Sequence, residues 1–138
     1  MRKIIFFALV LILSVSCRNN SGNVNAGAKQ FEMSGVWKGL LPAADCSGID
    51  YILSLQPDGS YKMTITHIDG EGDGIDIVFF SQGKVVRVSE DDVLYLRLLP
   101  PPGNDTVYFK VVDSNILRLV DKHLQEPQNP QLYNIVKE

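Results

Sequence analysis

The feature that most constrains the fold is an alternation of apolar and polar residues with a period of two, which recurs from Ser34 onward. Successive side chains of a β-strand point to opposite faces, so this pattern predicts strands with one buried face. No segment shows a sustained helical period, and we therefore predict an all-β fold. The apolar positions that share the pattern are Ile49, Tyr51, Leu53 and Leu55; Tyr61, Met63, Ile65 and His67; Leu94, Leu96 and Leu98; Val107, Phe109 and Val111; Leu117 and Leu119; and residues 132–136.

Turn residues separate these segments at the intervals typical of antiparallel sheets. They are Pro57-Asp58-Gly59 and residues 89–92, 100–105 and 113–115. The length of 138 residues suits one domain. We expect a small antiparallel up-and-down barrel, because closure removes the exposed strand edges, with a sandwich of the same strands as the alternative.

The N-terminus has the order of charges and apolar residues that is typical of a secretion signal. Arg2 and Lys3 precede residues 4–15, which carry no charge, and small Ser16 precedes Cys17. Residues 13–17 resemble a bacterial lipobox, in which the cysteine is lipidated and acylated. A plain secretory signal with an incidental cysteine is the alternative.

This pattern predicts a signal peptide over residues 1–16, a lipid anchor with a flexible polar tether over 17–33, and a barrel domain over 34–138. We expect Cys17 to carry the lipid and the protein to lie in the cell envelope, held on the membrane by its acyl chains. Arg18 is not the aspartate that retains enterobacterial lipoproteins in the inner membrane, so we expect the outer membrane.

The charge of the chain excludes one class of partner. The formal net charge is −3, and removal of the signal with Arg2 and Lys3 makes it more negative. No basic stretch is interleaved with aromatic residues. We therefore expect no binding to nucleic acid.

Residues 35–50 carry a more specific motif, which includes Gly39-Leu40-Leu41-Pro42-Ala43-Ala44-Asp45-Cys46-Ser47-Gly48-Ile49. This segment resembles the start of the NlpE N-terminal domain family of envelope-stress and copper-resistance lipoproteins, whose pattern is G-x-L-P-C-A-D-C-x-G-I. The resemblance implies a lipocalin-like barrel that senses or binds other envelope proteins. It also places Asp45 and Cys46 in a binding motif and suggests copper as a ligand.

The chain departs from the family at Ala43, which replaces the first cysteine of the pair. Two thiolates at that spacing would chelate Cu(I) or form a disulfide, whereas Cys46 alone does neither within the chain. We therefore expect no bound cofactor. Met63 and His67 are the other candidate copper ligands. The alternatives for Cys46 are a half-buried loop thiol beside core residues and a disulfide between two copies in the oxidising envelope.

Two further groups of residues have two alternative interpretations each, a binding role and a simpler structural role. Residues 69–74 resemble the start of a calcium loop, but the closing glutamate is absent and an acidic hairpin loop explains them better. Aromatic residues would either line the mouth of a ligand-holding barrel or pack in its core, and we expect core packing. These residues are Trp37, Phe79, Phe80, Tyr95 and Tyr108.

Catalysis has no support in the sequence. The two histidines, His67 and His123, lie in no catalytic motif, and no phosphate-binding glycine loop occurs. Our main prediction is a non-enzymatic, lipid-anchored sensing or binding module. The alternative is a lipocalin-like carrier of a small apolar ligand, which would need a continuous cavity inside the barrel.

Overall fold

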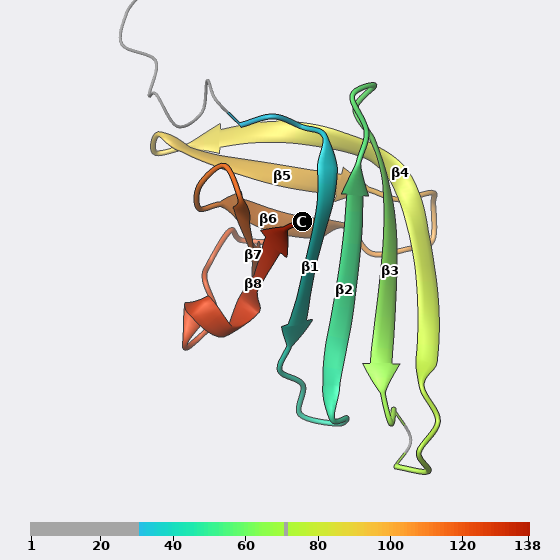
Figure 1. The fold of residues 1–138 in the computed structure, drawn as a ribbon. Coiled ribbons are helices and arrows are strands. Elements are labelled where there is room, and N and C mark those ends of the chain that lie inside the picture. Colours follow the sequence, from blue (N-terminus) through green and yellow to red (C-terminus); the bar gives the residue numbers. More distant parts are fainter. Residues whose placement is uncertain (1–30, 71) are drawn as a thin grey trace, which may run out of the picture.

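The computed structural model describes residues 31–70 and 72–138, and these residues form one antiparallel sheet that closes into a barrel. Each strand pairs with the next along the chain, and the last pairs with the first (Figure 1). The predicted all-β, up-and-down barrel is confirmed. The strands are β1 (Gly35–Leu41), β2 (Gly48–Leu55), β3 (Ser60–Ile68), β4 (Ile77–Glu90), β5 (Val93–Leu99), β6 (Val107–Val111), β7 (Ile116–Val120) and β8 (Asn134–Lys137).

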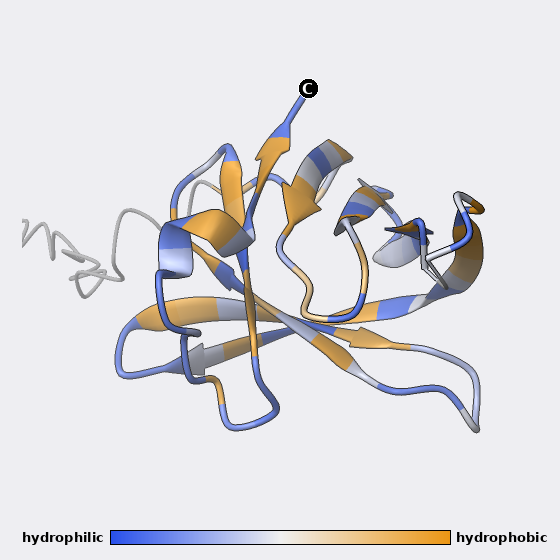
Figure 2. Ribbon diagram, turned by 90° about the horizontal axis from the view of Figure 1, so that it is seen from below, coloured by the Kyte–Doolittle hydropathy of each residue, from blue (hydrophilic) through white to orange (hydrophobic). Residues whose placement is uncertain are grey.

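The core lies where the alternation of the sequence places it. Tyr51, Leu53 and Leu55 of β2 are buried, and the residues between them are more exposed. Tyr61 and Met63 of β3 and the apolar positions of β5 follow the same rule, and loops in Figure 2 are mostly hydrophilic. The side chains that fill the interior with 2% exposure or less are Trp37, Leu41, Leu53, Leu55, Tyr61, Leu96, Leu98, Phe109, Leu117 and Ile135.

Strand β4 is the longest strand and has two halves with different neighbours. Its first half pairs with β3, from Ile77 opposite His67 to Lys84 opposite Ser60. Its second half pairs with β5, from Lys84 opposite Leu99 to Glu90 opposite Val93. Gly83 lies at the change of partner, where an added Cβ would be 1.9 Å from the carbonyl oxygen of Leu99. Glycine therefore allows the close approach that turns β4 across the barrel.

The barrel closes between β1 and β8. Trp37 pairs with Lys137 and Lys38 with Val136, and the Lys38 ammonium lies 2.8 Å from a Glu138 carboxylate oxygen. We expected the last strand to span residues 132–136, which was wrong at its start. Residues Pro130–Tyr133 form a 3₁₀ helix, η1, because Pro130 supplies a helical φ at its start, and Leu132 is exposed.

The chain joins the core before β1 begins. Phe31 is 3% exposed, and Met33 packs against the core. Arg87 of β4 donates a hydrogen bond of 2.9 Å to the carbonyl of Phe31 and contacts the Met33 sulfur. The folded domain thus includes residues that we placed in the tether, and it starts before Ser34. The expected signal and Cys17 lie outside the described residues.

Candidate functional site: the β1–β2 loop and its end of the barrel

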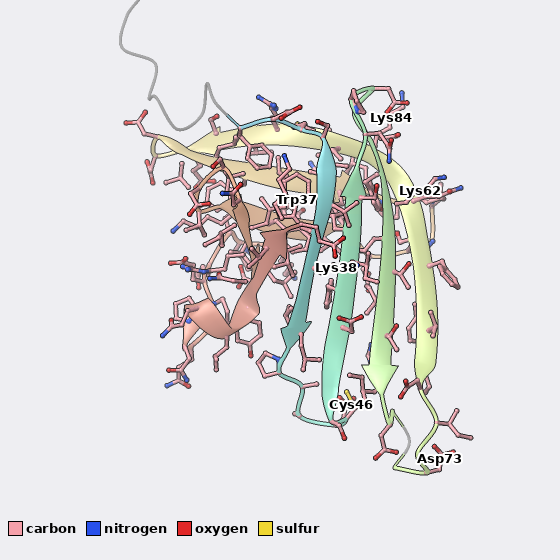
Figure 3. The ribbon with its side chains drawn as sticks, in the orientation of Figure 1. Trp37, Lys38, Cys46, Lys62, Asp73 and Lys84 are labelled. Atoms are coloured by element: carbon pink, nitrogen blue, oxygen red, sulfur yellow. The ribbon has the colours of Figure 1, made fainter. Side chains whose placement is uncertain are left out.

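The family motif forms the loop between β1 and β2, at one end of the barrel (Figure 3). The loop is tied to β3, because the Ser47 amide donates to the Ile68 carbonyl at 3.0 Å. The Cys46 thiol donates to the Gly48 carbonyl at 3.3 Å. Gly48 has a φ of +153°, a conformation that favours glycine. The motif thus forms an ordered loop with a half-buried thiol.

The predicted site residues of this loop differ in accessibility. Asp45 is exposed, whereas Cys46 is half-buried and free. Ala43, which stands at the position of the missing cysteine, is half-buried as well. The loop therefore offers solvent one carboxylate and part of one thiol.

Of the two other candidate copper ligands, His67 lies near this loop and Met63 does not. His67 pairs with Ile49 at the same end of the barrel, and its ring packs edge-on against Phe79 with centroids 5.3 Å apart. Met63 pairs with Leu53 and is 3% exposed. It lies four residues farther along β3, which corresponds to about 13 Å of strand.

This donor set does not fit Cu(I). Selective Cu(I) sites bring two or more soft ligands together, and only the Cys46 sulfur is near the loop surface. Among residues 31–70 and 72–138, no three His, Cys, Asp or Glu side chains are grouped in a way that would hold a metal ion. The geometry gives no route to a copper site through Met63.

The carboxylates of the β3–β4 loop hold backbone groups. The Gly74 amide donates to Asp69 at 2.6 Å, the Ile75 amide to Asp73 at 2.9 Å, and the Asp69 amide to Asp76 at 3.1 Å. Residue 71 lies outside the described part of the chain. The segment joins β3 to β4 as the predicted acidic hairpin loop, and its described carboxylates stabilise turns.

The aromatic residues divide into three groups, and our expectation of core packing holds for Trp37 alone among the five. Tyr95 and Tyr108 are half-buried outside the core cluster, and Phe79 and Phe80 are exposed. Trp37 is fully buried and packs against Phe31, with ring centroids 5.8 Å apart. Phe79 and Phe80 of β4 are 52% and 81% exposed. They lie in the half of β4 that, among the described strands, pairs only with β3. The sequence contains a signal for apolar side chains on both faces of this strand, since residues 77–80 are all apolar and do not alternate.

The size of the side chains inside the barrel tests the carrier hypothesis, which needs a continuous cavity. Trp37, Tyr61 and Phe109 are the largest of the fully buried side chains. Tyr51 packs edge-on against Phe109, with centroids 6.5 Å apart, and burial raises the pKa of its hydroxyl. Within the described residues, the buried side chains of this small barrel are large and apolar, which favours a packed core over a carrier cavity.

An antiparallel sheet closed by successive hairpins, with the motif loop at one end, defines a small lipocalin-like barrel. The sequence pattern of the NlpE N-terminal domain matches residues 37–129, and the chain belongs to this family. Within the described residues, no helix is long and apolar enough to cross a membrane.

Two solved structures are similar to the chain. The Cpx pathway activator NlpE of Escherichia coli is 26% identical, with a TM-score of 0.55 over 70% of this chain and 45% of that one. This chain therefore spans less than half of the E. coli protein. A protein of Shewanella oneidensis assigned to the lipoproteins is 21% identical, with a TM-score of 0.58 over 80% of this chain and 93% of that one, and shares the fold. No curated protein matches the sequence.

Proposed function

We propose that this protein is a lipid-anchored sensing or binding module of the bacterial envelope, non-enzymatic and of the NlpE type. The observation that supports this most is the family match, which covers residues 37–129 of the barrel and includes the motif loop. The lipobox-like residues 13–17 supply the anchor. The domain then acts through contacts with other envelope proteins.

The position of Phe31 indicates which end of the barrel is connected to the lipid anchor. Phe31 is held by Arg87 in the second half of β4, and the chain toward Cys17 leaves from there. Figure 1 shows the start of β1, just after this residue, at the end of the barrel opposite the β1–β2 loop. A pull from the membrane thus acts on one end of the domain, while the motif loop is available to partners at the other.

Crosslinking in intact cells tests the binding role. A photoreactive residue at Asp45, which is exposed in the motif loop, should capture a defined envelope protein. The same probe at Ser114, an exposed position in the β6–β7 turn, serves as the matched control. Capture of lipids alone from both positions, together with an unaltered envelope-stress response on deletion, would contradict the proposal.

The outer-membrane location rests on Arg18 and is tested separately. Density-gradient fractionation of membranes should place the protein with outer-membrane markers. Substitution of Arg18→Asp should move it toward the inner membrane. Equal recovery of the parent protein from both membranes would contradict the assignment.

A further inference from the structure

The first half of β4 is an open sheet edge. Residues 77–82 pair with β3 on one side, and within the described residues no strand pairs with them on the other, since β5 takes over at Lys84. In an antiparallel sheet, alternate residues of such an edge direct N–H and C=O groups away from the paired strand. This edge therefore offers a row of backbone donors and acceptors to another extended chain.

The edge lacks the features that usually prevent pairing. Natural edge strands are protected by lysine, proline, bulges or a covering segment. The sequence Ile-Val-Phe-Phe-Ser-Gln at 77–82 has no charge and no proline. Val78, Phe79 and Phe80 are 46%, 52% and 81% exposed, so apolar side chains flank the edge on both faces of the sheet.

The charges at the two ends of this edge select the strand that would pair with it. Asp76 lies just before Ile77, beside the acidic β3–β4 loop. Lys84 lies at the other end, opposite Ser60, and Lys62 lies at the same end of β3, opposite Gln82. Figure 3 shows both lysines far from Asp73 of the loop. An incoming antiparallel strand must be acidic at its start, apolar in its middle and basic at its end. The β4 strand itself has this pattern.

We propose that residues 77–82 are the interface of a dimer in which β4 of one copy pairs antiparallel with β4 of a second copy. A two-fold axis at Phe80 pairs residues 78–82 of the two copies. It brings the Asp76 side chain toward Lys84 of the second copy just beyond this segment, because both lie four residues from the axis, while β5 pairs with the backbone of Lys84. The symmetry repeats this ion pair at the other end. It also uses both open edges at once, so the assembly is closed.

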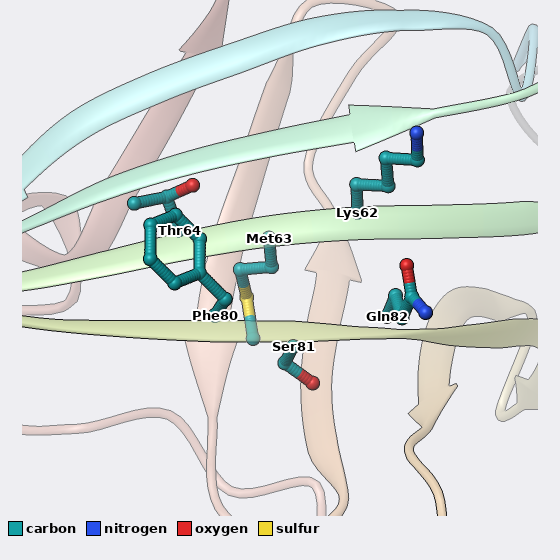
Figure 4. A pocket seen from close by; sticks show the side chains of 6 residues that line it. All are labelled: Lys62, Met63, Thr64, Phe80, Ser81 and Gln82. Atoms are coloured by element: carbon teal, nitrogen blue, oxygen red, sulfur yellow. The ribbon is translucent and has the colours of Figure 1, made fainter.

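The surface beside the axis has room for the second aromatic ring. A groove of about 460 Å³ adjoins Phe80 on β3 and β4 (Figure 4). It is lined by Lys62, Met63, Thr64, Phe80, Ser81 and Gln82. Phe80 of the second copy would contact Phe80 and the stem of Gln82 in this groove, and lose most of its exposure.

The dimer is compatible with a lipid anchor on each copy. The two-fold axis places the two Phe31 residues at opposite ends, but residues 18–30 separate Phe31 from Cys17. Thirteen residues span at most about 45 Å when extended. Both anchors can thus reach one membrane when the shared strands lie along its surface.

Sedimentation equilibrium of residues 17–138 with Cys17→Ser tests the proposal, in reducing buffer so that Cys46 forms no intermolecular disulfide. The closed sheet and core of residues 31–138 justify the use of this soluble form. We expect a reversible monomer–dimer equilibrium. Phe80→Lys should abolish it by placing two like charges on the axis, whereas Val86→Lys, an exposed site in the paired half of β4, should not.

Charge reversal gives the sharper test. Asp76→Lys and Lys84→Asp should each weaken the dimer about tenfold or more, since two ion pairs become two repulsions. A mixture of the two variants should dimerise as tightly as the parent, because every pair across the axis is again opposite in charge. Asp113→Lys, which removes a carboxylate from the β6–β7 turn, is the matched control.

Three results would overturn the proposal. These are a parent protein that stays monomeric up to millimolar concentration, a dimer indifferent to the Phe80 and charge variants, and a mixture that shows no recovery. The proposal is also overturned if the parent stays monomeric and its β4 edge instead binds an extended segment of another protein. Near-ultraviolet circular dichroism of each variant verifies that the barrel is intact.

Discussion

The ammonium of Lys137 lies 5.0 Å from the centroid of the Trp37 ring, and the two residues are direct partners across the β1–β8 seam. This contact joins the last strand to the largest side chain of the core. A cation over an indole ring contributes about 0.5–1 kcal/mol at a partly exposed site. The seam is thus stabilised by an interaction between the two ends of the folded chain.

Replacing the cation at this seam should weaken the fold. We expect Lys137→Met to lower the free energy of unfolding by about 0.5–1 kcal/mol, because the stem is kept while the charge over Trp37 is lost. Urea denaturation followed by tryptophan fluorescence measures the change. Lys122→Met, at an exposed loop position, is the control, and equal effects of both substitutions would contradict the assignment.

The N-terminal contact of the core should be measurable in the same way. Phe31→Ala removes a ring that is 3% exposed and packs on Trp37, so we expect a loss of about 3 kcal/mol. Glu32→Ala, at an exposed neighbour, should cost far less. Equal urea midpoints for the two variants would show that Phe31 contributes nothing to the barrel.

Gly83 should tolerate no side chain. Gly83→Ala places a Cβ 1.9 Å from the Leu99 carbonyl oxygen, so either the turn of β4 or its pairing with β5 must shift. We expect a destabilisation of about 3 kcal/mol or more, from overpacking together with lost strand pairing. Thermal unfolding of this variant and of Gln82→Ala compares the melting temperatures at the position where β4 changes partner and at its exposed neighbour. A melting temperature for Gly83→Ala as high as that of Gln82→Ala would show that the close approach of β4 to Leu99 does not require glycine.

The stability should depend on pH through Glu126. Hydrogen bonds from Arg118 and then Lys110 lower the pKa of Glu126 from its ordinary value of 4.5. Because the folded pKa is the lower one, this stabilisation is present above the unfolded pKa and is lost as the pH falls through the folded one. Glu126→Gln should therefore cost about 0.5 kcal/mol at pH 7, after allowance for solvent screening, and nothing in strong acid. Urea titrations at several pH values measure the difference, and a gap that persists at low pH would contradict it.

The copper prediction follows from the ligand count. We expect the mature domain to bind Cu(I) weakly and Ala43→Cys to strengthen binding by at least about tenfold, or about 1.4 kcal/mol. The half-buried thiol of Cys46 would then gain a partner in the same loop. Competition with a chromophoric Cu(I) chelator compares the two proteins. Tight binding by the parent that is lost in Cys46→Ser would reveal a site that the geometry does not indicate.

The lipid anchor has its own test. Cys17→Ala should abolish membrane retention and leave the barrel intact, because the described core begins only at Phe31. Incorporation of radiolabelled palmitate, measured beside membrane fractionation, distinguishes this from a plain secretory signal. Equal labelling of the variant and the parent would refute lipidation at Cys17.

The sequence predicted those strands in which one face is buried. Leu53 and Leu96 lie in such strands, and alternation identified them because a period of two reports burial on one side. Phe80 belongs to a strand that is apolar on both faces, so alternation gave no signal there. Phe31 is isolated in a polar segment and has no period, and only the closed barrel reveals the surface that it covers. The separation of Cys46 from Met63 likewise depends on register, which the pattern does not specify.

The seam between β1 and β8 also determines how the domain responds to mechanical load. All of β1 is registered on β2, from Gly35 opposite Leu55 to Leu41 opposite Ile49, whereas only Trp37 and Lys38 are registered on β8. An anchor at Cys17 would transmit tension through Phe31 into β1, the strand that holds this short seam. Under such tension the barrel would unzip along β8 first, while the β1–β2 hairpin with the motif loop stayed folded. A partner that grips the loop would thus remain attached to a domain that has already begun to open.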